Sequence, residues 1–249
     1  MELPYFEIAS KLWNPLIVAL LMPLSATLRT DNWTTACKWD TVIPFEPMWE
    51  ELKRIIKPNW AIVLFWSEPF SSALRMSNIK YFRYDIIWEK ERPTNIFFMK
   101  KQIWKVHEII SIFYKKQPTY NPQMCERKSN NEKNRDLLKY DNNWSKTHEW
   151  QIYRYSEWYD DTKHYPRSIQ KFKREMWKWR HPTQKPVALI EYLIKTYTNE
   201  WETVLDFTMG SGTTAIACIN TNRNFIWFEL DEWYRNIANK RIQDKLSEK

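Results

Sequence analysis

The hydrophobic pattern is clearest in the last quarter of the chain. Apolar residues recur at every third or fourth position between Pro186 and Tyr197, which predicts a helix that begins at a proline. Two short apolar runs and two further helical patterns follow. They predict a strand, a helix, a second strand and a final helix over 203–207, 213–220, 224–230 and 231–246. Such a strand–helix–strand unit joins parallel strands through a right-handed crossover.

The first half of the chain repeats this alternation. Its pattern predicts helices over 47–56 and 69–77 and strands over 61–65, 81–89 and 106–114. Strands that alternate with helices indicate an open α/β sheet covered on both faces. A separate apolar run over 16–24 is too short to cross a bilayer, so we expect no membrane partner.

Residues 115–180 have no clean period and are rich in Lys, Arg, Asn and Tyr. One interpretation is a solvated insertion without regular structure. The other is a segment that faces nucleic acid, because basic groups contact phosphates and aromatic rings stack on bases. The net charge of +8 suits a polyanionic partner, although charge also serves solubility. Both interpretations stay open at this point.

Three widely separated cysteines have no spacing typical of a zinc site or a disulfide framework. They favour a reduced, cytoplasmic protein without a metal. A length of 249 residues suffices for one large domain with a full hydrophobic core.

The segment from Asp206 to Thr214 carries the clearest chemical signal. It reads Asp-Phe-Thr-Met-Gly-Ser-Gly-Thr-Thr and lies between a predicted strand and a predicted helix. Glycines let the backbone approach a ligand closely, and the start of a helix offers free N–H groups. The next predicted strand ends in Glu229, whose carboxylate can accept hydrogen bonds from ribose hydroxyls. The pattern predicts a nucleoside-cofactor site but does not distinguish S-adenosylmethionine from a nicotinamide dinucleotide.

Two motifs together resemble a known family. Residues 181–186 (His-Pro-Thr-Gln-Lys-Pro), followed by residues 205–214, resemble the paired signature of the N6-adenine/N4-cytosine DNA methyltransferases. Residues 43–49 and 67–70 are also similar to members of that family. The order is similar to the permuted arrangement, in which the catalytic loop is N-terminal and the cofactor motifs are C-terminal. The resemblance implies a Rossmann-like S-adenosylmethionine-dependent methyltransferase fold, with a mostly parallel seven-strand sheet and helices on both faces.

On this resemblance the chain is a single methyltransferase domain. It would comprise a catalytic half over 31–116, a target-recognition insertion over 117–180 and a cofactor-binding half over 181–249. Glu229 would hold the ribose, and Lys185 would meet the carboxylate of the cofactor. The residues expected around S-adenosylmethionine are Thr183, Lys185, Asp206, Phe207, Met209, Gly210, Ser211, Gly212, Thr213 and Glu229.

The resemblance also implies double-stranded DNA as the partner. Basic residues of the middle segment are then candidates for phosphate contacts, namely Lys115, Lys116, Arg127, Lys128, Lys171, Lys173 and Arg174. A homodimer is possible, and the sequence does not decide the oligomeric state.

The catalytic loop of the family, an Asp/Asn/Ser-Pro-Pro-aromatic sequence, is degraded here. Asp31 stands in the acidic position, but both prolines are missing, and Asn32 stands where a ring would stack on the extruded base. No strand pattern leads into this loop, and we hypothesise that residues 1–30 come from a frameshift or a wrongly assigned start. Asp31 favours adenine N6 as the target. The alternatives are cytosine N4, a catalytically inactive DNA-binding remnant and a nicotinamide-dependent oxidoreductase.

Tryptophan is as abundant as glycine is rare. The chain has 16 tryptophans and 2 glycines, where average usage of about 7% would give about 17 glycines. We hypothesise that UGA encodes glycine in the source and is translated here as tryptophan. The gene would then have UGA where a turn or the family pattern demands glycine, at Trp33, Trp60, Trp66, Trp144, Trp179, Trp201 and Trp227. It would have UGG at Trp39, Trp49 and Trp88, where the family carries tryptophan.

Overall fold

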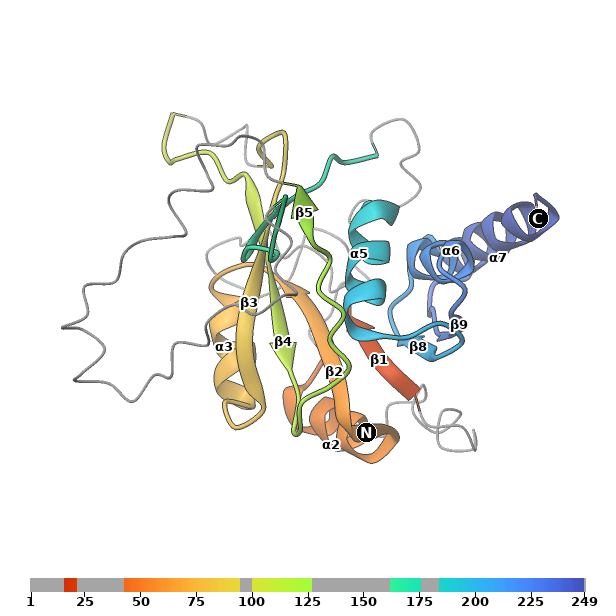
Figure 1. The fold of residues 1–249 in the computed structure, drawn as a ribbon, viewed down its shortest axis with the longest axis horizontal. Helices are drawn as coiled ribbons and strands as arrows, with labels where there is room; N and C mark the ends of the chain where they lie inside the picture. The colour runs from red at the N-terminus through yellow and green to blue at the C-terminus, as the bar shows by residue number, and fades with distance from the viewer. Residues whose placement is uncertain (1–15, 22–42, 95–99, 127–161, 176–183, 249) are drawn as a thin grey trace. The chain divides into compact units, whose positions relative to one another are not determined.

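The computed structural model describes residues 16–21, 43–94, 100–126, 162–175 and 184–248. Within this part, seven strands form one sheet in the order β7-β3-β4-β2-β1-β8-β9 (Figure 1). These strands are β1 (Leu16–Leu21), β2 (Ile56–Trp66), β3 (Phe82–Glu89), β4 (His107–Phe113), β7 (Ile169–Lys171), β8 (Thr203–Asp206) and β9 (Asn224–Trp227). The described helices are α2 (Phe45–Ile55), α3 (Phe70–Ser77), α5 (Val187–Tyr197), α6 (Thr213–Asn220) and α7 (Glu232–Ser247).

The chain divides into two compact units. One comprises residues 1–121 and 168–249 and contains the seven-stranded sheet with the described helices. The other comprises residues 122–167, where β5 (Cys125–Glu126) pairs antiparallel with β6 (Lys163–His164). The second unit lies within the range predicted for the target-recognition insertion.

The strands of the sheet run parallel except for β4. β1 pairs parallel with β2 and β8, β8 with β9, and β3 with β7, whereas β4 is antiparallel to β2 and β3. The parallel strands therefore end at one edge of the sheet, which we call the carboxyl edge, and β4 begins there at His107. From the neighbours β1 and β8, the chain continues to strands on opposite sides, β2 and β9. Ligands of open α/β sheets bind outside the carboxyl ends at such a point.

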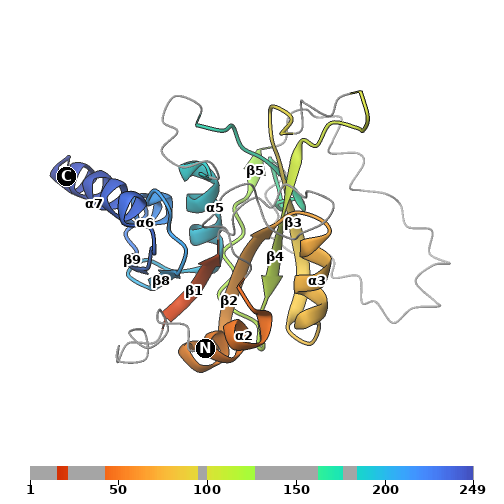
Figure 2. The same cartoon turned by 180° about the vertical axis from the view of Figure 1, so that it is seen from behind.

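Helices cover both faces of the sheet (Figure 1, Figure 2). Residues 61–66 of β2 are all buried, although successive side chains of a strand point to opposite faces. Phe113 of β4 packs against Trp49 of α2, with ring centroids 4.9 Å apart. On the opposite face Tyr84 of β3, whose ladder partner precedes Phe113 by one residue, shares a 2.8 Å hydrogen bond with Tyr197 of α5. α2 and α5 therefore lie on opposite faces.

The predicted elements are present, with shifted ends. The helix predicted over 47–56 is α2, and the strand predicted over 61–65 is the buried part of the longer strand β2. The prediction placed Glu229 at the end of a strand. β9 ends earlier, at Trp227, so Glu229 lies two residues beyond it. The α/β fold class and the mostly parallel seven-strand sheet are confirmed.

The largest difference concerns β1. The sequence pattern indicated no strand before Asp31, yet Leu16–Leu21 pairs on both sides, with β2 and with β8. The prediction that no strand precedes the loop was wrong, because a strand between two parallel neighbours needs only a short apolar run. Leu20 lies opposite Asp206 in the ladder, so β1 ends beside the turn that follows β8. The frameshift hypothesis for residues 1–30 stays a prediction.

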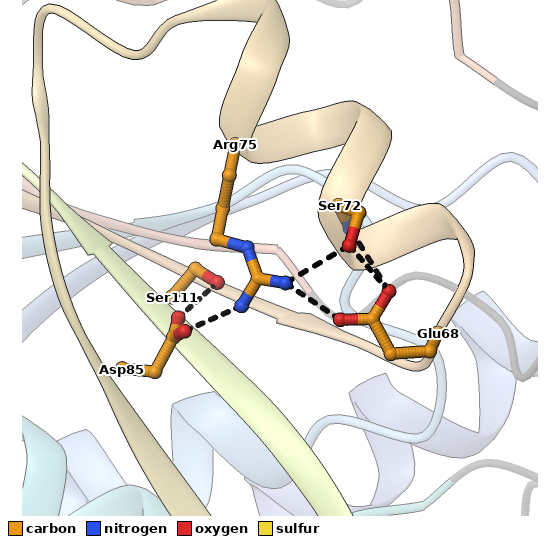
Figure 3. A network of polar contacts seen from close by, with 5 residues as sticks. All are labelled: Glu68, Ser72, Arg75, Asp85 and Ser111. Carbon is orange, nitrogen blue, oxygen red and sulfur yellow. Dashed lines mark hydrogen bonds and ion pairs between the residues drawn. The ribbon is translucent and has the colours of Figure 1, made fainter.

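A polar network fastens α3 to the sheet (Figure 3). Arg75 of α3 donates to Asp85 of β3 at 2.5 Å and to Glu68 at 2.6 Å. Glu68 also accepts from the hydroxyl of Ser72 at 2.7 Å, and Ser111 of β4 donates to Asp85 at 2.6 Å. Burial raises the pKa of Glu68, but serine hydrogen bonds and the charge of Arg75 outweigh it and leave the pKa below its usual value. The motif of residues 67–70 (Ser-Glu-Pro-Phe) therefore has a structural role, because its glutamate anchors α3 to the sheet.

The described tryptophans differ in how well they fit their sites. Trp49 and Trp88 are buried, and each donates its indole N–H to a neighbouring oxygen. Trp201 has a φ of +67° and a side chain that is 71% exposed, and the indole nitrogen of Trp66 is buried without a hydrogen-bond partner. Trp60 lies buried within β2, where the register with β1 shifts, and its φ is not positive, so the backbone there does not require glycine. The geometry at 66 and 201 therefore supports the recoding hypothesis, and that at 60 does not.

Candidate functional site

The turn after β8 uses both glycines of the chain. Gly210 and Gly212 have φ values of +57° and +84°, a region that residues with a Cβ rarely adopt. Gly212 is also the N-cap of α6, and a Cβ built there would lie 3.1 Å from the Cα of Ala238 in α7. Glycine at 212 therefore allows α6 to begin in close contact with α7.

Asp206 organises the inside of this turn. Its carboxylate is fully buried and accepts hydrogen bonds from the backbone N–H of Thr208 at 3.0 Å and the hydroxyl of Thr214 at 2.5 Å. Burial raises the pKa of Asp206 to about 7, and the charge of Glu229 adds to the rise, while the two hydrogen bonds oppose it. Asp206 therefore orders the turn from within, through donors that carry no charge.

Glu229 closes the turn from the other side. One carboxylate oxygen accepts from the backbone N–H of Gly210 at 2.7 Å, and the other accepts from that of Asp231 at 3.0 Å. Asp231 in turn caps α7 by accepting from the backbone N–H of Tyr234 at 3.1 Å. The side chain of Glu229 is half-buried, and each carboxylate oxygen can accept more than one hydrogen bond. Glu229 therefore keeps acceptor capacity for a ligand hydroxyl.

The Gln-Lys-Pro part of the predicted motif contacts two different regions. The hydroxyl of Ser211, in the turn, donates to the side-chain oxygen of Gln184 at 3.0 Å. Lys185 is only 3% exposed, and its ammonium nitrogen lies 2.7 Å from a carboxylate oxygen of Glu108 in β4. Pro186 is the N-cap of α5. The lysine that we expected to meet the cofactor carboxylate therefore pairs with a carboxylate of the chain itself.

Glu108 lies between two lysines. One of its oxygens pairs with Lys90 and the other with Lys185, and all three side chains are almost fully buried. Burial raises the pKa of Glu108, but the two ammonium charges outweigh this effect and lower it to about 2. Burial lowers the pKa of Lys90, and the charge of Glu108 offsets only part of that change. We call these residues the Lys–Glu–Lys triad; with all three ionised, it has one excess positive charge at the carboxyl edge.

The structure brings the expected cofactor residues together. Those buried in the turn between β8 and α6 are Asp206, Phe207, Met209, Gly210, Ser211, Gly212 and Thr213. Glu229 completes the group through its bond to the turn. Thr183 and the proposed catalytic residue Asp31 lie outside the described residues.

Three of the predicted DNA contacts lie at the same edge as the turn. Lys171 is the last residue of β7 and pairs with Glu89 of β3 at 2.9 Å. Lys173 and Arg174 follow after one intervening residue, Phe172. Because β7 and β3 are parallel, this strip begins where β3 ends, at the carboxyl edge.

The other predicted contacts are not brought to this edge by the described structure. Lys115 and Lys116 follow the carboxyl end of β4, and the antiparallel direction of that strand places them at the opposite edge of the sheet. Arg127 and Lys128 lie outside the described residues. Their proposed contact with DNA stays a prediction.

Sequence reasoning missed the triad and the role of Gln184. A single acidic residue in the mostly apolar strand His-Glu-Ile-Ile-Ser-Ile-Phe was a usable signal, because a buried charge needs a partner. That signal could have singled out Glu108. It could not have identified Lys90 and Lys185, which belong to other elements of the chain.

Neither a metal site nor a membrane-spanning helix is found among the residues that the structure describes. Among them, no group of three His, Cys, Asp or Glu side chains is placed to hold a metal ion. None of their helices combines the length and the apolar character needed to cross a membrane.

Comparison with known proteins bears on this site. A family model described as DNA methylase matches residues 4–240. Type II methyltransferase M2.DpnII of Streptococcus pneumoniae is 41% identical over 71 residues, which cover 28% of this chain and only 26% of that protein. Orphan methyltransferase M.BamHII of Bacillus amyloliquefaciens is 27% identical over 221 residues, which cover 80% of this chain and 81% of that protein.

Solved structures share the fold at low sequence identity. The crystal structure of an M1.HpyAVI–SAM complex is 23% identical with a TM-score of 0.61, over 97% of this chain and 98% of that one. The cytosine-N4-specific PvuII DNA methyltransferase is 14% identical with a TM-score of 0.61, over 97% of this chain and 88% of that one. These likenesses concern the fold, and the family match supplies the assignment. Because that match spans nearly the whole sequence, the chain belongs to the N6/N4 DNA methylase family.

Proposed function

We propose that this chain transfers a methyl group from S-adenosylmethionine to the exocyclic amine of a base in DNA, with adenine N6 as the favoured target. The observation that carries the proposal is the turn over residues 206–214, which lies at the carboxyl edge beside β1 and is closed by Glu229. Membership of a DNA methylase family supports the reaction class. It leaves the nicotinamide-dependent alternative without support.

The residues of the turn suit a nucleoside cofactor. Glu229 can accept hydrogen bonds from ribose hydroxyls, and Gly210 brings no Cβ that would keep a ligand from the backbone of the turn. S-Adenosylmethionine, when bound, supplies a methyl group on a sulfonium. Asp206 holds the turn in shape. Lys185 has three N–H donors and pairs with Glu108, and its contact with the carboxylate of the cofactor stays a prediction.

The DNA side of the reaction rests on two further assignments. Asp31 is the proposed acceptor for the amino hydrogens of the target base, as the family resemblance implies. The basic strip of Lys171, Lys173 and Arg174 is the proposed contact for DNA phosphates, since it shares the carboxyl edge with the turn.

Isotope transfer tests the proposal. The full chain is incubated with DNA and S-adenosylmethionine labelled in its methyl group, and the nucleosides of the digested DNA are identified by mass spectrometry. Labelled N6-methyladenine is the expected product. Labelled N4-methylcytosine would retain the reaction class and correct the target. Cofactor binding without transfer would favour the inactive remnant, for which the missing prolines after Asp31 are the specific observation.

A matched pair of variants tests the cofactor site directly. Glu229→Gln removes the charge that faces the turn and is expected to weaken cofactor binding about tenfold or more, since a hydrogen bond to a charged group contributes about 1.5–3 kcal/mol. Glu232→Gln, three residues along the chain on the exposed start of α7, is the control and should bind like the wild type. If neither the wild type nor the control binds S-adenosylmethionine, the proposed function is wrong.

A further inference from the structure

Glu175 caps α5 from outside the helix. The N-cap residue Pro186 makes no side-chain cap bond, so the first N–H groups of the helix need another acceptor. One carboxylate oxygen of Glu175 accepts from the backbone N–H of Val187 at 2.8 Å, and the other accepts from the side-chain nitrogen of Gln184 at 3.4 Å. Glu175 therefore holds both the start of α5 and the residue that contacts the cofactor turn.

Arg241 of α7 connects Glu175 to the same turn. One guanidinium nitrogen donates to the carbonyl oxygen of Ser211 and to the hydroxyl of Thr213, both at 3.2 Å. A second lies 3.8 Å from a carboxylate oxygen of Glu175. Since Gln184 also contacts both Glu175 and Ser211, these side chains close a ring of contacts. We call Glu175, Gln184, Ser211 and Arg241 the contact ring.

The strip that leads into Glu175 is held along its length. Residues 169–171 form β7 and pair with β3. The indole N–H of Trp88 donates to the carbonyl oxygen of Phe172 at 3.0 Å, and the ring of Phe172 packs against Tyr192 of α5 with centroids 5.6 Å apart. The strip is thus joined to both the sheet and α5. It carries the proposed DNA contacts Lys171, Lys173 and Arg174.

We infer that the contact ring couples DNA binding at the basic strip to cofactor binding at the turn, with Glu175 as the positioning residue. The inference rests on the proposed function. Phosphate contacts that restrain the strip further also restrain Glu175, and through it Gln184 and Arg241, which contact Ser211. Cofactor that binds an already ordered turn loses less conformational entropy, so its affinity rises. By linkage, the cofactor strengthens DNA binding by the same factor.

Glu175→Gln separates the coupling from the fold. Glutamine keeps an oxygen that accepts from Val187, but it lacks the negative charge that faces Arg241. The matched control is Glu191→Gln on α5. Glu191 accepts from Asn220 of α6 at 2.7 Å and is not a member of the contact ring.

The measurement is the affinity for S-adenosylhomocysteine, the unreactive product, with and without a mixed-sequence DNA duplex. DNA is expected to tighten binding to the wild type and to Glu191→Gln at least about fivefold, the lower end of typical allosteric coupling. Glu175→Gln is expected to show less than about twofold tightening, although its affinity without DNA stays within about threefold of wild type. The reciprocal titration, DNA with and without S-adenosylhomocysteine, should give the same factors.

A second variant tests the same coupling independently, in case Glu175→Gln does not fold. Arg241→Lys keeps the positive charge, but an ammonium cannot contact the turn and Glu175 through two separate nitrogens. It should also lose the tightening.

The inference is overturned if Glu175→Gln and Arg241→Lys keep wild-type tightening, or if the wild type binds both ligands without any coupling. These outcomes leave the proposed function intact. Failure of the wild type to bind S-adenosylhomocysteine at all would instead refute the proposed function.

Discussion

Two buried carboxylates at the carboxyl edge have pKa values that are shifted in opposite directions. Burial raises the pKa of Asp206, at the end of β8, to about 7. Burial also acts to raise the pKa of Glu108, near the start of β4, but two ammonium groups lower it to about 2. The difference lies in the partners, because Asp206 accepts from a backbone N–H and a hydroxyl, whereas Glu108 accepts from Lys90 and Lys185.

The comparison shows that burial alone does not set the charge of an acidic side chain. Desolvation favours the neutral carboxyl, and only a nearby opposite charge reverses that preference. Glu108 has its counter-charges within the chain, so the triad is an architectural ion cluster. Asp206 has neutral donors and sits in the turn proposed to receive a cofactor.

The largest expected effect comes from breaking the triad. Glu108→Gln would leave two buried ammonium groups without a counter-charge and should lower the free energy of unfolding by about 3–5 kcal/mol. Glu89→Gln is the matched control, since its pair with Lys171 is exposed and should contribute less than about 1 kcal/mol. Urea unfolding of both variants near neutral pH measures the difference. Equal losses would mean that burial of the triad carries no energetic weight.

A smaller effect is expected in the pH dependence of stability. The folded pKa of Asp206 is raised from 3.8 to about 7, so the folded state holds a proton that the unfolded state has released. The free energy of unfolding should therefore fall as pH rises between about 4 and 7, by up to about 4 kcal/mol at 1.36 kcal/mol per pKa unit. Asp206→Asn should flatten this slope.

Glu108 provides the opposite sign in the same titration. Its folded pKa lies below the ordinary value of 4.5, so its contribution is present above that pH and is lost as pH falls toward about 2. Unfolding measured across both windows distinguishes the two groups. A wild-type curve that is flat between pH 4 and 7, and unchanged by Asp206→Asn, would contradict the raised pKa of Asp206.

The smallest expected change in the free energy of unfolding concerns the backbone at residue 201, just before β8. Gly210 and Gly212 occupy positive φ at the end of β8, whereas Trp201 occupies a φ of +67° just before that strand begins. Trp201→Gly should raise the free energy of unfolding by about 1 kcal/mol, because a left-handed conformation costs a residue with a Cβ about 1–2 kcal/mol. Thermal unfolding measures the change.

Trp233→Gly is the control for that substitution. Trp233 is also exposed but lies in the first turn of α7, where glycine is a poorer helix former than tryptophan, so the sign should reverse. Destabilisation by Trp201→Gly would count against glycine at position 201 and against the recoding hypothesis there.

The cofactor turn was predictable because its signals are local. Glycines, a preceding apolar run and a following helical period lie within a few residues of one another, and they predict a turn between a strand and a helix. β1 was not predicted, since its six residues form a strand through two neighbours that are distant in the sequence. The position of Lys115 and Lys116 was also unpredictable, because it depends on β4 running against its neighbours.

The amino-acid sequence by itself determined the alternation of helices and strands, the glycine turn and the resemblance to DNA amino-methyltransferases. Each of these depends on residue types at short spacings, which act through local backbone preferences. Only the tertiary structure decided that Lys185 pairs with Glu108 and that Glu175 meets Arg241. Those pairs join elements far apart along the chain, and opposite charges attract in space whatever their separation in sequence.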